Sequence, residues 1–121
     1  MKAAFSRPVV QRLRRACLAF PETSESASWG HPNFRAGRKI FAAFEIVRGR
    51  PSIAVRASPA DADGLLRSPD FFLTPYGRGL WVSIWADGTM DWSQVRRLLE
   101  QSYRSVANKR MLAALSARPS D

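Results

Sequence analysis

The first apolar pattern along the chain has helical spacing. Its apolar positions recur every three or four residues and would share one face of a helix: Val10, Leu13, Cys17 and Phe20. We expect this helix to run from Arg7 to Phe20. Ser6 would cap it, because a serine hydroxyl can accept a hydrogen bond from a free backbone N–H of the first turn. Pro21 would end it, because proline has no N–H to continue the hydrogen-bond ladder.

Residues 22–57 change to the short alternating runs of strands. The pattern predicts strands over residues 24–29, 34–36, 39–47 and 53–57. Gly37 and Arg38 would form a tight turn between the second and third strands, since glycine accepts a positive φ. A second turn would follow at residues 48–51. In the strand over 39–47, Ile40, Ala42, Phe44 and Ile46 alternate with Phe41, Ala43, Glu45 and Val47.

The rest of the chain predicts two helices, with a short strand and a longer strand between them. A helix from Pro59 to Arg67 would be capped by Ser58, and residues 70–79 form a loop with a short strand at 71–73. Residues 80–86 alternate as a clear strand. Asp91 would cap the last helix, whose buried stripe is Val95, Leu98, Leu99, Ser102 and Val106. Residues from Lys109 onward continue as a short amphipathic tail that ends in disorder at 119–121.

The predicted fold class is α+β. The order α-β-β-β-β-α-β-α with tight turns predicts an antiparallel sheet of about five strands, with helices packed mainly on one face. At 121 residues the chain has the length of one domain, which we place at 1–108, with 109–121 as a helical or disordered tail.

The two faces of this sheet have different compositions. The aliphatic sets Ile40/Ala42/Phe44/Ile46, Ile53/Val55 and Val82/Ile84 predict the face that the helices cover. The opposite face would then carry Phe41, Arg56, Trp81 and Trp85. Aromatic rings beside guanidinium groups are typical of surfaces that stack nucleic-acid bases. A second small core under a loop or the C-terminal tail, or a dimer interface, would use the same residues.

The charge balance favours a polyanionic partner. The chain has 19 Lys and Arg against 10 Asp and Glu, a formal net charge of +9, although arginine-rich composition can also follow from genome base composition. Basic residues are concentrated at the predicted turns of one segment, where only Glu45 opposes them. These candidate phosphate-binding residues are Arg35, Arg38, Lys39, Arg48, Arg50 and Arg56.

Catalytic and metal-binding patterns are missing from the sequence. The single cysteine, Cys17, lies on the apolar face of the first helix and is expected to be a buried hydrophobe. His31, between Gly30 and Pro32, is expected to bond the backbone. Glu22 and Glu25 come closest to a carboxylate pair, but they lie where solvated acids are ordinary. We therefore expect no enzyme, no cofactor and no metal. No membrane-length or signal-like apolar run is present, and a lone cysteine fits a cytoplasmic protein.

Several short stretches occur together in an order that resembles the MmcQ/YjbR-like family of small bacterial proteins. They are residues 13–14, 17–21, Glu25, 29–35, 37–42, 75–76, 81–82 and 102–103. The resemblance extends to about Asn108, and Glu22 replaces a glycine that is usual after the helix-ending proline. It implies an α+β fold and a DNA-binding role in which winged hairpins contact the duplex, with no catalytic residues.

The leading hypothesis is a nucleic-acid-binding module, DNA or RNA, that acts through backbone charge with weak sequence specificity. The alternative is a protein-interaction or homodimerisation module that uses the Trp81/Trp85 face. An iron-handling role like that of the frataxins, which share the element order, is disfavoured because hard cations need clustered carboxylates.

Overall fold

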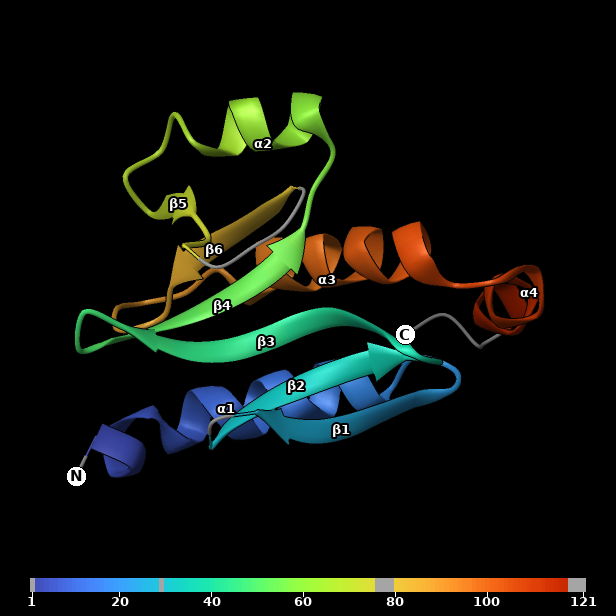
Figure 1. The fold of residues 1–121 in the computed structure, drawn as a ribbon, viewed down its shortest axis with the longest axis horizontal. Coiled ribbons are helices and arrows are strands. Elements are labelled where there is room, and N and C mark those ends of the chain that lie inside the picture. The colour runs from blue at the N-terminus through green and yellow to red at the C-terminus, as the bar shows by residue number, and fades with distance from the viewer. Residues whose placement is uncertain (1, 29, 76–79, 118–121) are drawn as a thin grey trace.

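A computed structural model describes residues 2–28, 30–75 and 80–117 of the chain (Figure 1). The described part contains four helices and six strands, and the sheet order is β1-β2-β3-β4-β6-β5 with antiparallel pairing throughout. In chain order the elements are α1 (Lys2–Leu18), β1 (Thr23–Ser28), β2 (His31–Ala36), β3 (Lys39–Val47), β4 (Arg50–Arg56), α2 (Pro59–Leu65), β5 (Phe71–Leu73), β6 (Trp81–Trp85), α3 (Trp92–Val106) and α4 (Lys109–Ala117).

The predicted α+β class and antiparallel sheet are confirmed. The sixth strand is β5, which the sequence indicated only as a short strand within a loop. The expected disorder at 119–121 and the end of the first strand at Trp29 lie outside the described residues. The described helices are also too short or too polar to cross a membrane.

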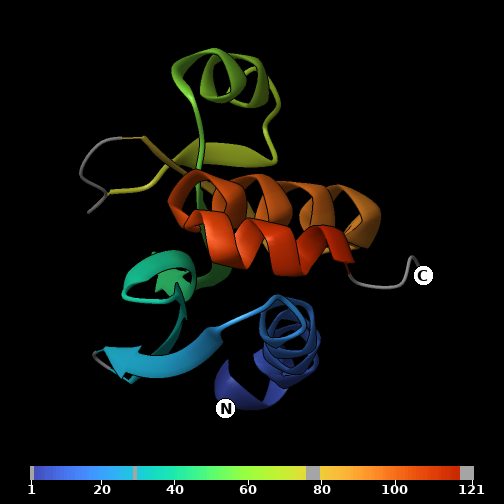
Figure 2. The same ribbon diagram turned by 90° about the vertical axis from the view of Figure 1, so that its right-hand side faces the viewer.

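Helices cover one face of the sheet. Figure 1 shows α1 behind β1 and β2 and α3 behind β4, with α2 beside the β5–β6 edge, and α3 also packs against β3. In the side view of Figure 2, α1 lies to the right of β1. No described helix lies on the opposite face, which we call the open face. Trp81 and Trp85 belong to it, because they alternate along β6 with the core residues Val82 and Ile84.

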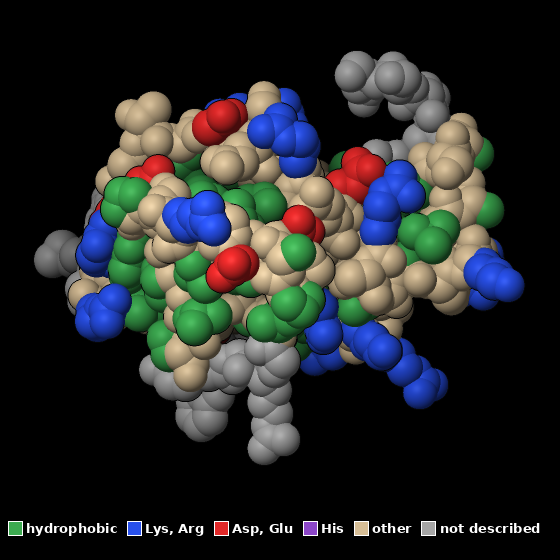
Figure 3. Space-filling view, turned by 90° about the horizontal axis from the view of Figure 1, so that it is seen from above, with side chains coloured by type: hydrophobic (Ala, Val, Ile, Leu, Met, Phe, Trp, Pro, Cys, Tyr) green, Lys and Arg blue, Asp and Glu red, His purple; other side chains and the backbone are tan. Residues whose placement is uncertain are grey.

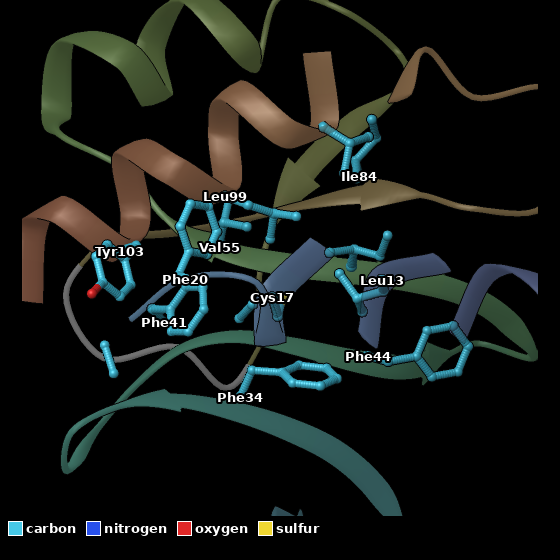
Figure 4. Close-up of a cluster of buried hydrophobic side chains, with 14 of the residues drawn as sticks. Leu13, Cys17, Phe20, Phe34, Phe41, Phe44, Val55, Ile84, Leu99 and Tyr103 are labelled. Atoms are coloured by element: carbon cyan, nitrogen blue, oxygen red, sulfur yellow. The ribbon is translucent and has the colours of Figure 1, made fainter. Parts of the chain in front are cut away.

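The core lies between the sheet and these helices (Figure 4). Leu13 and Cys17 of α1 are fully buried there, as their spacing predicted, and so is Leu99 of α3. Helix α4 also reaches the core through Met111 and Leu115. The segment that the sequence indicated as a tail therefore packs with the rest of the domain.

The start of α1 differs from the prediction. The helix begins at Lys2, so Ser6 lies inside it and is not its N-cap. Pro8 also lies inside the helix, where it removes one backbone hydrogen bond. Ala3 and Ala4 are strong helix formers, and they extend the helix on the N-terminal side of Pro8. The helix ends at Leu18, three residues before Pro21.

Two of the three predicted caps, Ser58 and Asp91, and the predicted turn at Gly37 are confirmed. The Ser58 hydroxyl accepts from the N–H of Asp61, and the Asp91 carboxylate accepts from the N–H groups of Ser93 and Gln94. Gly37 has a φ of 61°, which suits glycine in the turn between β2 and β3.

The expectation that Phe41 lies on the face of the tryptophans is wrong. Phe34 pairs with Ala42 and Arg35 pairs with Ile40, so Phe41 is the extra residue of a β-bulge in β3. The bulge reverses the alternation at this point. Phe41 is fully buried, with its ring 5.9 Å from that of Phe20 in the core (Figure 4). Ile40, which was predicted for the core, lies opposite Arg35 on the open face.

The bulge also opens the ladder between β3 and β4, and Ser102 of α3 fills the gap. The register of these strands begins at the pair Ala42–Val55. At the next position, the buried Ser102 hydroxyl donates to the carbonyl of Phe41 and accepts from the N–H of Arg56 at 3.0 Å. One helix side chain thus satisfies two backbone groups of the sheet.

Candidate nucleic-acid interface

The six predicted basic residues do not form one surface. The β2–β3 turn precedes β3 and the β3–β4 turn follows it, so the two turns lie at opposite ends of this nine-residue strand (Figure 1). At about 3.3 Å per residue, the two ends are separated by roughly 30 Å, well beyond the range over which exposed charges act together in physiological salt. Each end is therefore a separate electrostatic environment.

Three chain segments meet at the β2–β3 turn. The Gly37 N–H donates to the carbonyl of Glu22, which lies just before β1. A Cβ atom at Gly37 would lie 3.9 Å from the sulfur of Met111, so α4 packs against the turn. The turn, the start of β1 and the first turn of α4 consequently lie side by side.

This junction brings basic residues together from distant parts of the sequence. We call it the α4 end and define it by Arg35, Arg38, Lys39, Lys109 and Arg110, with Glu22 as the carboxylate that bonds one of them. Arg38, Lys39 and Lys109 are exposed. Figure 3 shows Lys and Arg side chains projecting from this end, on the right as in Figure 1, and acidic side chains lying among basic ones over the rest of that face.

Two of the α4-end guanidinium groups have partners within the protein. Arg35 donates from Nη1 to the carbonyl of Arg38 at 2.7 Å and from Nε to the Ser26 hydroxyl, which braces the turn. Arg110 makes a bidentate ion pair with Glu22 at 2.7 and 2.6 Å. Hydrogen bonding from Arg110 lowers the pKa of Glu22 below its ordinary value, so this carboxylate is charged at neutral pH.

The other end of β3 carries charges of both signs. Arg50 forms a bidentate ion pair with Asp87 at 2.6 and 3.1 Å. Asp70 and Asp91 also line the 270 Å³ hollow beside this pair. Arg48, in the turn with φ 51°, adds one exposed cation. Arg48 and Arg50 thus share their surroundings with several carboxylates.

The ring of Trp85 is already occupied on both sides. The Arg50 guanidinium lies 3.9 Å from its centroid and the Phe72 ring stacks at 4.1 Å, and two groups this close to one centroid must lie on opposite faces. A nucleic-acid base could stack on Trp85 only by displacing one of them. At Trp85 the predicted aromatic face is therefore covered on both sides by the protein's own side chains.

Arg56 is also held within the protein. Its Nε donates to the carbonyl of Ile40 at 2.8 Å, which is a second bond across the gap left by the bulge. The Arg56 guanidinium lies 4.9 Å from the centroid of Trp81, its direct cross-strand neighbour. Arg56 is half-buried and already bonded within the protein, so it is a poor candidate for a phosphate contact.

The residues with potential for catalysis do not come together. Cys17 is buried, and this burial raises the pKa of its thiol. Glu22 and Glu25 pair with different arginines, Arg110 and Arg14. Over residues 2–28, 30–75 and 80–117 there is no group of three or more His, Cys, Asp or Glu side chains that could hold a metal ion.

Sequence reasoning missed Lys109, Arg110 and Glu22 as members of the candidate site. The adjacent pair Lys109-Arg110 was visible in the sequence. Arg110 lies 88 residues from Glu22, however, and only the packing of α4 shows that the two side chains meet. The buried Met111, next to this pair, was the available signal that the segment is part of the domain.

Comparison with known proteins gives a family and a fold. A family model described as YjbR matches residues 18–105. Proteins named "Uncharacterized protein YjbR" from Escherichia coli K12 and O157:H7 are each 26% identical over 104 residues, which cover 82% of this chain and 87% of theirs.

Two crystal structures share the fold at low sequence identity. A Deinococcus radiodurans protein with the domain DUF419 has a TM-score of 0.74 at 20% identity, covering 93% of this chain and 91% of that one. A Pseudomonas syringae protein has a TM-score of 0.69 at 14% identity, covering 78% of this chain and 96% of that one.

Proposed function

The chain belongs to the YjbR family, and from the geometry of the α4 end we propose that it binds nucleic acid, mainly through the sugar–phosphate backbone. The observation that carries the proposal is the meeting of Arg38, Lys39 and Lys109, all exposed, at one junction of the fold. Exposed cations within one Debye length, about 8–10 Å, act on the same stretch of polyanion. Each phosphate that they neutralise releases counterions, which drives binding.

The position of α4 supports an anion at this end. Lys109 and Arg110 occupy its first turn, where the positive end of the helix dipole disfavours cations. A phosphate placed there would interact favourably with the dipole and with both side chains. An acidic protein surface would use the same attraction, but the closely spaced phosphates of nucleic acid can engage several separate cations at once and release counterions as they do so.

The proposed contacts carry little sequence information. A turn and the start of a helix present long basic side chains to phosphate, and such contacts position a protein without reading bases. We therefore expect weak, salt-sensitive binding, with dissociation constants on the order of 10⁻⁴–10⁻⁶ M at physiological salt. Because the stacking surface of Trp85 is closed, duplex is expected to bind at least as well as a single strand.

The test is the salt dependence of binding to a fluorescently labelled duplex, measured by anisotropy. The double variant Arg38→Gln/Lys39→Gln removes two exposed cations from the α4 end. On duplex DNA the slope of log affinity against log salt should become shallower by about 0.9 for each lost contact.

The matched control is Arg96→Gln/Arg97→Gln, which removes two adjacent exposed cations from α3. Its net charge equals that of the test variant, and its slope should stay close to that of the unaltered protein. Equal losses in the two variants would mean that binding follows total charge and has no site at the α4 end. No salt-dependent binding at low salt would refute the proposed function itself.

A further inference from the structure

Glu22 occupies an unusual place in the backbone. Its φ is 55°, a left-handed conformation that favours glycine and strains other residues. The position is fixed, because the Glu22 carbonyl accepts from the N–H of Gly37 at the β2–β3 turn. A side chain is thus held at the α4 end at some cost in backbone energy.

The Glu22 carboxylate makes the contact that a phosphate would make. It accepts two hydrogen bonds from the Nε and Nη2 atoms of Arg110. A guanidinium group binds a carboxylate and a phosphate with the same two-pronged geometry. The side chains of Arg110 and Glu22 are 71% and 42% exposed, so the pair faces water and can exchange partners without unfolding the domain.

We propose that Arg110 is a phosphate-binding residue of the α4 end and that Glu22 is its internal competitor. The inference rests on the proposed function and deepens it. In the free protein Glu22 holds the guanidinium. A nucleic-acid phosphate must displace the carboxylate to engage Arg110, and the displaced carboxylate then stays close, because its backbone is tied to the turn. The Glu22–Arg110 ion pair therefore lowers the affinity for nucleic acid. It also favours polyanions, which offer several phosphates at once, over single phosphate groups.

The test substitutes Glu22→Gln, which keeps the size and the strained backbone and removes the charge. Duplex should bind several-fold more tightly, because a phosphate no longer has to displace a carboxylate to engage Arg110 and no displaced negative charge stays beside the bound phosphate. Adding Arg110→Gln should abolish this gain, while Arg110→Gln alone should change the affinity of the parent protein less.

The matched control is Asp87→Asn. Asp87 forms the same kind of bidentate pair with Arg50 at the opposite end of β3, so its substitution changes the net charge equally. Equal gains in Glu22→Gln and Asp87→Asn, with the parent protein still binding, would overturn the competitor role and leave the proposed function standing. If neither the parent nor any variant shows salt-dependent binding, the proposed function fails, and this inference fails with it.

Discussion

The hydroxyl of Ser102 is predicted to hold the sheet together at the bulge in β3. Ser102→Ala removes that hydroxyl and little else. In the folded protein the carbonyl of Phe41 and the N–H of Arg56 would each lose a partner. Ser102 is fully buried, so water cannot replace the hydroxyl without opening the contact between α3 and the sheet.

The expected loss of stability is moderate but measurable. A buried polar group left unpaired costs about 1–3 kcal/mol, and two such groups are involved. Alanine is the better helix former, by roughly 0.5 kcal/mol, and the two freed groups face each other across the strands and can relax together. We therefore expect the free energy of unfolding to fall by about 2 kcal/mol, close to the low end of the range for two unpaired groups.

Urea denaturation followed by circular dichroism measures this change. With a slope of about 1–3 kcal/mol per molar urea, the midpoint should fall by about 1 M. Ser105→Ala is the matched control. Ser105 is exposed on the same helix and its hydroxyl donates only within that helix, to the carbonyl of Ser102, so the change should stay within about 0.5 kcal/mol. If Ser102→Ala destabilises the protein no more than Ser105→Ala does, the hydroxyl does not support the sheet as argued.

Three further predictions concern the core and the open face. Burial raises the pKa of the Cys17 thiol, so thiol reagents should leave the native protein unmodified at mildly alkaline pH and react fully after denaturation; fast native reaction would contradict the burial. Burial also raises the pKa of Glu45, a shift that His31 partly offsets, and its Oε1 has no hydrogen-bond partner. The stability linked to protonated Glu45 is present below the unfolded pKa and lost as pH rises through the folded pKa. Glu45→Gln should therefore raise the melting temperature at neutral pH but not at acidic pH. An equal change at both pH values would exclude the carboxylate as its cause. For the alternative of a dimer through the Trp81/Trp85 face, sedimentation at micromolar concentration should give a dimer that Trp85→Ala dissociates, whereas a monomer in both proteins would rule that interface out.

Features that depend on neighbouring residues were predictable from the sequence. Ser58 and Asp91 cap their helices by bonding N–H groups two or three residues away, and Gly37 supplies a local turn. The alternation of β4 and β6 is also local, and it placed Val55 and Ile84 in the core correctly. Each of these follows from the chemistry of a few adjacent positions.

Features that depend on distant contacts were not predictable in this way. The bulge at Phe41 is stabilised by Ser102, which lies 61 residues away, and the alternation of β3 alone gives no sign of it. The candidate site has the same character, because Arg110 reaches Glu22 only once α4 has packed on the turn. The sequence indicated a basic segment, while packing decided which cations meet.

The most direct test of the α4 end as a nucleic-acid interface is a two-dimensional NMR titration of the labelled protein with a short duplex at low salt. We predict that the amide signals of residues 35–39 and 108–112 shift progressively on titration. Signals of residues 48–50 and 85–88, at the other end of the sheet, should stay in place. Shifts centred on that second group, or spread evenly over the surface, would contradict the account.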